Sequence, residues 1–375
     1  MTNRGMVVVG GSIAAATAAS TFRSAGWQGP VTVIAAESVP PYSRVPLSKG
    51  ILAGTQDPSS SALASLPTDV ELRLSTTAVA LHPGLHSVEL SDGEFVGYAG
   101  LVIATGSRPR RLARPGQLGE YVVRTLYDAA AIAARMPGVQ SAIVVGAGFL
   151  GMEIATTLVQ RGITVTVVDR DPPLERVLGE WLARRLVQHA VEAGVRFVNS
   201  PDGVELIGRP VHGIRHSPDS EIHADLVITA AGDIPNVEWL ESSGLRIAGG
   251  VVVDRHCRVT NDITAAGDVT VVESAPGSFH RTPHWSNAVA QGRAAALSLL
   301  DPRAAPTCSD HYFWTEQFGI DLKIAGRLPV ASHPIVLDGD LDKNTALLQW
   351  RDSEGETIAS AAWNYRIPVA RLRSL

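Results

Sequence analysis

Short runs of apolar residues, each ended by glycine and followed by small residues, recur along the chain. The first run, at residues 6–11, predicts a buried strand that leads through a glycine-containing turn into a small-residue helix ending near residue 25. A further apolar run predicts a second strand at residues 31–35. Consecutive apolar residues are typical of parallel strands that are covered on both faces. The pattern therefore predicts an α/β fold.

The same arrangement occurs a second time, later in the chain. Residues 142–145 predict a short strand, a helix follows to about residue 161, and residues 165–168 predict the next strand. Three other apolar runs, at 102–106, 227–232 and 263–268, end in small-residue turns. The first two are expected to close the two β–turn–α–β units, with Ala104, Thr105 and Gly106 at one strand end and Gly232 at the other.

Both turns have the composition of a dinucleotide-binding turn. The first glycine permits the tight turn, the second admits a pyrophosphate, and the third lets the helix pack on the strand. The helix N-terminus then offers N–H groups and a positive dipole to the phosphates. The second copy has all three glycines, Gly146, Gly148 and Gly151. The first copy is weaker because small residues replace two of them; it reads Gly10, Gly11, Ser12, Ile13, Ala14 and Ala15.

An acidic residue follows the second strand of each unit, where it can accept a hydrogen bond from a ribose hydroxyl. Glu37 stands in this place in the first unit and Asp169 in the second. Asp169 should repel a 2′-phosphate, which favours NADH, although Arg170 and Arg176 leave NADPH open. Two such units indicate two nucleotides, typically a bound flavin and a transient nicotinamide.

Composition narrows the class of protein. Hydrophobic residues make up 45% of the 375 residues and charged residues 18%, against about 25% in an average globular protein, which excludes a disordered chain. A net charge of −5 disfavours general nucleic-acid binding. No apolar stretch reaches the ~20 residues of a membrane span, and residues 1–5 leave no room for a secretory leader. We expect a soluble, cytoplasmic protein of two or three domains.

A series of ordered segments matches a known flavoprotein family. The segments are PYSRVPLSK at 41–49, ATG at 104–106, RTLYDA at 124–129, GxGxxGxE at 146–153, PNVEWL at 235–240, AGD at 266–268, HWSNA at 284–288 and FWTEQ at 313–317. On these segments nearly the whole chain resembles the FAD-dependent, NADH-using ferredoxin reductases, which include putidaredoxin reductase and the reductases of aromatic-ring dioxygenases.

The resemblance implies three domains. An FAD-binding domain would comprise residues 1–106 and 233–306, interrupted by an NAD(P)H-binding domain at 107–232. A small C-terminal α+β domain would follow at 307–375, after Pro306. This last domain looks short for the family, which leaves its part in partner docking open.

The resemblance also implies roles for individual residues. Lys49 would lie beside the flavin ring near N5, and Glu153, in the first turn of the NADH-domain helix, would pair with it and keep it oriented. From the residues alone, Lys49 could equally be a solvated loop lysine and Glu153 a favourable acid near a helix N-terminus. Ala36 stands where the family commonly has aspartate, so Glu37 either takes over the ribose contact or that contact is missing.

Further flavin contacts follow from matched positions. Asp268 would accept from flavin-side hydroxyls, unless it is an ordinary helix cap. The other matched positions are Arg44, Val79, Arg124, His284, Trp285 and Trp314.

The implied activity is hydride transfer from NADH to FAD, followed by single-electron transfer to an iron–sulfur ferredoxin. That ferredoxin would supply a cytochrome P450 or a Rieske-type ring-hydroxylating oxygenase. Disulfide-reductase chemistry is excluded, because no cysteine precedes Cys257 and the only other cysteine is Cys308. An NADH oxidase, or a redox-sensing flavoprotein similar to apoptosis-inducing factor, stays open as the alternative, as does a monomer or a weak dimer.

Overall fold

A computed structural model describes residues 4–275, 277–301, 303 and 311–375. These residues form two compact units, each built from separate stretches of the chain. The first unit consists of Met1–Ser43, Ser61–Arg108 and Ile234–Asp310, and the second of Arg44–Ser60, Pro109–Asp233 and His311–Leu375. The expected domain boundary at Pro306 and the cysteine Cys308 lie outside the described residues, and the division into three domains stays a prediction.

The first unit contains a sheet in which β1 occupies a central place. The strand order is β3-β2-β1-β6-β5-β4, with β18 also paired to β6. Pairing is parallel from β3 to β6 and for β18, and antiparallel in the β4-β5-β6 extension. The strands are β1 (Gly5–Val9), β2 (Val31–Ile34), β3 (Glu71–Arg73), β4 (Ala78–His82), β5 (Ser87–Leu90), β6 (Phe95–Ile103) and β18 (Ile263–Ala265).

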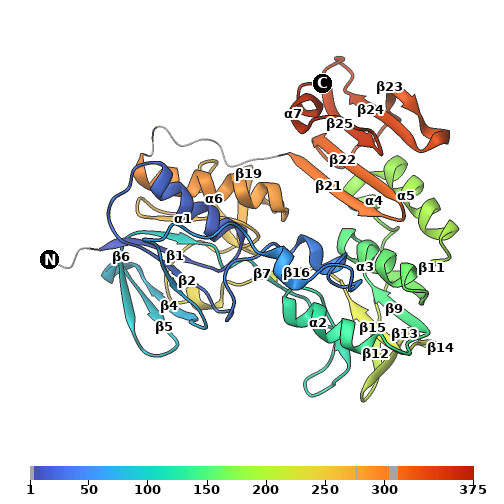
Figure 1. Ribbon diagram of the computed structural model, residues 1–375, viewed down its shortest axis with the longest axis horizontal. Helices are drawn as coiled ribbons and strands as arrows, with labels where there is room; N and C mark the ends of the chain where they lie inside the picture. The colour runs from blue at the N-terminus through green and yellow to red at the C-terminus, as the bar shows by residue number, and fades with distance from the viewer. Residues whose placement is uncertain (1–3, 276, 302, 304–310) are drawn as a thin grey trace. The chain divides into compact units, whose positions relative to one another are not determined.

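Two apolar cores explain why β1 has no polar residue. Met6 and Val8 belong to one core, and Val7 and Val9 to the other, because successive side chains of a strand point to opposite faces. The first core is closed by α1 (Ile13–Ser24) and α6 (Trp285–Leu300), which lie side by side in Figure 1. A Cβ added at Gly292 of α6 would lie 2.5 Å from the carbonyl oxygen of Ala14, so this close helix packing needs glycine.

The first unit is completed by short elements. They are η3 (Pro83–Leu85), η4 (Glu238–Leu240) and a three-stranded sheet of β17 (Val251–Val253), β19 (Thr270–Ala275) and β20 (Ser278–His280). Two short strands, β7 (Ser107–Pro109) and β16 (Asp233–Pro235), pair where the chain passes from one unit to the other.

The second unit contains the other nucleotide-type sheet. All of its strands are parallel, in the order β11-β10-β9-β15-β8. They are β8 (Glu120–Tyr121), β9 (Ser141–Val145), β10 (Thr164–Asp169), β11 (Arg196–Asn199) and β15 (Leu226–Thr229). The helices of this part are η1 (Val45–Ser48), η2 (Pro58–Ser61, which reaches the unit's boundary), α2 (Leu126–Arg135), α3 (Phe149–Gln160), α4 (Glu175–Leu178) and α5 (Glu180–Glu192).

A three-stranded antiparallel sheet packs on this nucleotide-type sheet through a shared apolar core that includes Ile143, Leu206 and Ile214. Its strands are β12 (Glu205–Gly208), β13 (Val211–Ser217) and β14 (Ser220–His223).

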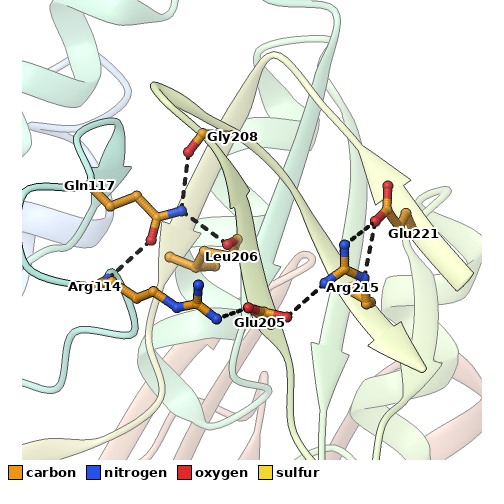
Figure 2. A network of polar contacts seen from close by, with 7 residues as sticks. All are labelled: Arg114, Gln117, Glu205, Leu206, Gly208, Arg215 and Glu221. Atoms are coloured by element: carbon orange, nitrogen blue, oxygen red, sulfur yellow. Dashed lines mark hydrogen bonds and ion pairs between the residues drawn. The ribbon is translucent and has the colours of Figure 1, made fainter. Parts of the chain in front are cut away.

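The edge of β12 is covered by a loop. The Gln117 side chain donates to the carbonyl oxygens of Leu206 and Gly208, at 3.0 and 3.1 Å, as Figure 2 shows. Glu205 pairs with both Arg114 and Arg215, and Arg215 also pairs with Glu221. These contacts satisfy outward-facing groups of an edge strand.

The C-terminal part of the second unit is an antiparallel sheet with the order β21-β22-β25-β24-β23. Its elements are β21 (Tyr312–Gln317), β22 (Ile320–Gly326), β23 (Ile335–Asp340), η5 (Leu341–Lys343), β24 (Thr345–Arg351), β25 (Thr357–Trp363) and α7 (Val369–Arg373). Strand β21 contacts α3 (Figure 1), which brings this sheet to the glycine-rich turn of the second unit. Among the described residues, no helix is long and apolar enough to span a bilayer.

The strands and helices predicted from the apolar runs are confirmed. Most of their ends move by one or two residues, but the strand predicted at 102–106 is the end of β6, which begins at Phe95. The predicted strand at 6–11 ends at Val9, so Gly10 already belongs to the turn, and the strand predicted at 165–168 extends to Asp169. The α/β fold is confirmed.

Candidate functional site

The glycine-rich turn of the first unit is shaped by the end of a neighbouring strand. Gly10 has a φ of +145°, and a Cβ there would lie 2.1 Å from the carbonyl oxygen of Ala104. Ser12 is the N-cap of α1, its side chain makes no capping hydrogen bond, and the first turn holds no acidic residue. Ile13 and Ala14 open the helix. The first N–H groups of α1 are therefore not capped by a side chain, which is the arrangement that suits a phosphate.

Glu37 makes a local contact. Its Oε2 accepts a hydrogen bond from the Tyr42 hydroxyl at 2.6 Å, and both residues belong to the first unit. The carboxylate is thus held at the end of β2, and Tyr42 comes from the segment that carries the family resemblance.

Residues 104–106 directly follow the end of β6. Thr105 donates to the carbonyl oxygen of Asn236 at 2.9 Å, and the carbonyl oxygen of Gly106 accepts from the Asn236 N–H at 3.0 Å. These two bonds tie residues 104–106 to the start of the third stretch of this unit. Val79 lies in β4 and is exposed, so it can offer packing surface or backbone only.

Asp268 is half-buried in the turn between β18 and β19, so it is not a helix cap. Its carbonyl oxygen accepts from Arg281 at 2.6 Å. The preceding residue, Gly267, approaches Ala14, since a Cβ at Gly267 would lie 3.1 Å from that of Ala14. The structure therefore brings the turn that carries Asp268 to the start of α1.

Helix α6 begins at Trp285, and His284 is its N-cap. The His284 side chain accepts the Ser286 N–H, so this helix is capped by its own histidine. Trp285 is partly exposed.

The glycine-rich turn of the second unit needs each glycine for a different reason. Gly146 has a φ of +114°, and a Cβ there would lie 2.3 Å from the carbonyl oxygen of Ala230. A Cβ at Gly151 would lie 1.9 Å from the carbonyl oxygen of Gly146, so this glycine sets how closely α3 packs. At Gly148 a Cβ would meet no atom within 4 Å. The space beside Gly148 is open, as a pyrophosphate requires.

Asp169 ends β10 and folds back onto the turn. One carboxylate oxygen accepts the Ala147 N–H, and the other accepts the N–H groups of Arg170 and Asp171 at 2.6 and 3.2 Å. The side chain of Arg170 donates to the carbonyl oxygen of Pro201 at 3.2 Å. The acid that sequence predicts for ribose therefore also fixes the turn. Gly232, at the opposite side of this sheet end, accepts the Arg110 N–H through its carbonyl oxygen at 3.0 Å.

Lys49 and Glu153 form an ion pair, with 2.7 Å between Lys49 Nζ and Glu153 Oε2. Both residues belong to the second unit. Glu153 is the fifth residue of α3, because the helix begins at Phe149, so it lies in the second turn and not in the first. Glu153 therefore lies beyond the first turn, where the helix dipole acts most strongly.

Two hydroxyl groups complete the surroundings of Glu153. Ser48 donates to Oε2 at 2.7 Å, and Thr315 of β21 donates to Oε1 at 3.0 Å. Both residues lie in segments that carry the family resemblance, but neither is predicted to contact Glu153. Ser48 precedes Lys49 and Thr315 follows Trp314, and this adjacency to predicted site residues is the signal in the sequence.

Arg44 donates to the carbonyl oxygen of Arg124 at 2.6 Å, which joins two of the predicted flavin-contacting positions within the second unit. Trp314 stacks on Tyr312, with 5.8 Å between ring centroids, and Phe313 packs on Phe149 at 4.0 Å. Trp314 and Thr315 are adjacent in β21 and so point to opposite faces of the sheet.

The two turns fit dinucleotides on the evidence of their own geometry. In both helices that follow, α1 and α3, the N-cap makes no side-chain capping bond and the first turn has no acid. Cys257 is fully buried in the apolar core of the first unit, which suits a structural residue and not a redox thiol. Among the described residues, no His, Cys, Asp or Glu cluster could hold a metal ion.

Comparisons with known proteins agree with this geometry. Residues 4–292 match the family described as pyridine nucleotide-disulphide oxidoreductase. Rhodocoxin reductase of Rhodococcus erythropolis is 32% identical over 360 residues, covering 90% of this chain and 81% of that protein. The anthranilate 1,2-dioxygenase system ferredoxin–NAD(+) reductase component of Burkholderia cepacia is 31% identical over 380 residues, covering 98% and 93%.

A solved structure extends the likeness to three dimensions. The covalent putidaredoxin reductase–putidaredoxin complex matches with a TM-score of 0.87 and 27% identity, covering 99% of this chain and 92% of that one. With matching turns, sequence and fold, the chain belongs to the pyridine nucleotide-disulphide oxidoreductase family and, within it, to the ferredoxin reductases.

Proposed function

We propose that this protein is an FAD-containing reductase that takes a hydride from NADH and passes single electrons to an iron–sulfur ferredoxin. The observation that carries the proposal is the presence of two dinucleotide-type turns, each leading into a helix without a side-chain cap, in a chain with no cysteine before Cys257. With no thiol pair to receive the electrons, they must leave from the flavin itself.

The residues divide between the two nucleotides. FAD would be held by the first turn together with the strand-end and helix residues matched to the family, which are Gly10, Ser12, Ile13, Ala14, Glu37, Arg44, Val79, Ala104, Thr105, Gly106, Arg124, Asp268, His284, Trp285 and Trp314. NADH would be held by Gly146, Gly148, Gly151, Asp169 and Gly232. The fixed carboxylate of Asp169 favours NADH over NADPH, because it would repel a 2′-phosphate.

Bound FAD supplies a two-electron acceptor that can release electrons singly, which no side chain can do. Lys49 contributes a cation to the site, and cations stabilise negative charge that develops during hydride transfer. Glu153 Oε2 pairs with the Lys49 ammonium at 2.7 Å and so fixes the direction of the lysine side chain. We assign Lys49 and Glu153 as the pair that supports the chemical step.

The relatives suggest the partner. One is named a ferredoxin–NAD(+) reductase component of a dioxygenase system, and one solved relative is held covalently to putidaredoxin. The proposed partner of this chain is a small iron–sulfur ferredoxin, which would feed a Rieske-type oxygenase or a cytochrome P450. We further propose that the protein acts in the cytoplasm as a monomer or weak dimer.

Rapid mixing tests the proposal directly. NADH added to the flavin-loaded protein should bleach the flavin absorbance, and an oxidised ferredoxin should restore it faster than dissolved oxygen does. Reoxidation no faster than by oxygen, for every ferredoxin encoded nearby, would favour the NADH oxidase or redox-sensing alternative.

Lys49→Ala tests the role of the lysine. Flavin should stay bound while its reduction by NADH slows by about 10- to 100-fold, since a charge-assisted interaction is lost. Lys343→Ala is the matched control, because Lys343 also pairs with a carboxylate, that of Asp340 at 3.4 Å, but is largely exposed. Equal reduction rates in the two variants would show that Lys49 is a bystander.

A further inference from the structure

We propose that Thr315 is a positioning residue for Lys49, acting through the carboxylate of Glu153 with Ser48 as the second support. This inference rests on the proposed function, because it concerns the same lysine. It adds Thr315, a residue of the C-terminal sheet, to the residues that determine the orientation of Lys49.

The carboxylate of Glu153 is held from both sides. Oε1 accepts the Thr315 hydroxyl at 3.0 Å, while Oε2 accepts the Ser48 hydroxyl and the Lys49 ammonium, each at 2.7 Å. A carboxylate with donors on both oxygens cannot rotate freely about its terminal bond. The Glu153 side chain is 11% exposed and Thr315 is fully buried, so little water is available to replace these donors.

The Thr315 hydroxyl is itself oriented. Gln317, which faces the same side of β21 two residues on, donates through Nε2 to Thr315 Oγ1 at 3.3 Å. The Gln317 amide thus occupies a lone pair of Thr315 Oγ1 and cannot accept in return, so the single hydroxyl proton of Thr315 is directed to Glu153. The Oε1 atom of Gln317 is buried with no hydrogen-bond partner among the described residues. A buried acceptor without a partner lowers the stability of the fold, but in this orientation the Gln317 amide nitrogen can donate to Thr315.

Both supports are fixed to α3 by further contacts. The Ser48 carbonyl oxygen accepts the Thr157 hydroxyl of α3 at 2.7 Å. The end of β21 is held where the Phe318 N–H donates to Thr156 at 3.3 Å. At the start of the strand, Phe313 packs on Phe149, the first residue of α3. Glu153 is thus clamped between two segments that are each attached to its own helix, and the clamp sets where Lys49 points.

The chain offers an unusually clean test, because it contains three lysines, Lys49, Lys323 and Lys343. Acylation by an amine-reactive ester, followed by mass spectrometry, reports each lysine separately. Lys343 is highly exposed and serves as the internal reference for reagent reactivity. Lys323 pairs with Asp321 at 2.6 Å on β22, the strand next to β21, and reports any general loosening of that sheet.

The variant is Thr315→Val, which keeps the side-chain shape and removes the hydroxyl. In the flavin-loaded protein we expect Lys49 labelling, relative to Lys343, to rise by about fivefold to tenfold, as expected for a lost charge-assisted hydrogen bond. Labelling of Lys323 should not change, and Thr315→Ser should restore the ratio for Lys49. The flavin midpoint potential should fall by up to about 30 mV, a tenfold change in a two-electron equilibrium.

An unchanged Lys49 ratio in Thr315→Val would overturn the inference, and so would a parallel rise at Lys323, which would indicate a structural role only. Should Thr315→Val fail to fold, Ser48→Ala removes the donor to the other oxygen and must raise Lys49 labelling as well. Labelling needs no NADH. If the wild-type flavin is not reduced by NADH, the proposed function fails while the positioning of Lys49 is still tested.

Discussion

Replacing Gly148 and Gly151 separately by alanine should separate nucleotide binding from folding, although both glycines belong to one turn. At Gly151 the new Cβ would lie 1.9 Å from the carbonyl oxygen of Gly146, more than 1 Å inside the shortest contact that real Cβ atoms make. Helix α3 must then move away from its strand. Overpacking of this kind costs about 1–3 kcal/mol, and we expect the upper end because the clash is with backbone.

At Gly148 the new Cβ meets no atom within 4 Å, and a φ of −76° suits alanine. Loss of glycine at the N-cap should change the stability by less than about 1 kcal/mol. The methyl group would, however, occupy space that the proposed pyrophosphate needs, and would keep it from the first N–H groups of α3. Losing charge-assisted hydrogen bonds should weaken binding by about 10- to 100-fold.

Urea unfolding and calorimetric titration with NAD⁺, which does not react with oxidised flavin, measure the two effects. Gly148→Ala should unfold like the wild type but bind NAD⁺ weakly, and Gly151→Ala should unfold at lower urea. Wild-type affinity for NAD⁺ in folded Gly148→Ala would refute the placement of the pyrophosphate. Wild-type stability of Gly151→Ala would refute the packing argument.

Two further predictions concern stability alone. Tyr98 is fully buried, its hydroxyl has no hydrogen-bond partner among the described residues, and burial raises its pKa to about 12. An unfolded tyrosine ionises near pH 10, so the raised pKa of Tyr98 lowers the stability of the wild type as the pH rises from 10 to 12. In urea unfolding, the free energy of unfolding of Tyr98→Phe should rise relative to that of the wild type by about 1.4 kcal/mol between pH 8 and pH 11. An equal response of both proteins to pH would contradict this. Gln117→Ala should lower the free energy of unfolding by about 1–2 kcal/mol, because two hydrogen bonds to the edge of β12 disappear. Amide hydrogen exchange should accelerate in the sheet that contains β12 and β13 but not in the C-terminal sheet.

The local parts of this fold could be predicted from the sequence because they depend on near neighbours. The alternation of Met6 and Val8 with Val7 and Val9 between two cores produces an unbroken apolar run, and the backbone clashes at Gly10 and Gly151 are what make small residues necessary there. Such patterns can be found in a window of a few residues.

The surroundings of Glu153 could not be predicted in that way. Its donors Ser48 and Thr315 are 105 and 162 residues away in the chain, and no local period relates them. The same limit applies to Asp169, since only the folded turn shows that its carboxylate accepts main-chain N–H groups. The sequence predicts Glu153 in the first turn of its helix, whereas the structure has it in the second, because α3 begins at Phe149.

The clamp on Glu153 has a consequence for attempts to divide this protein. A fragment limited to residues 107–232 would contain the second glycine-rich turn and the whole of α3. It would nevertheless lack Ser48, Lys49 and Thr315, which together supply the described side-chain donors to the Glu153 carboxylate. The fragment would also expose Phe149, which packs on Phe313. The parallel sheet and α3 lie within one continuous stretch of sequence, but the second unit also includes Arg44–Ser60 and His311–Leu375, so we expect the fragment to be less stable than the full chain.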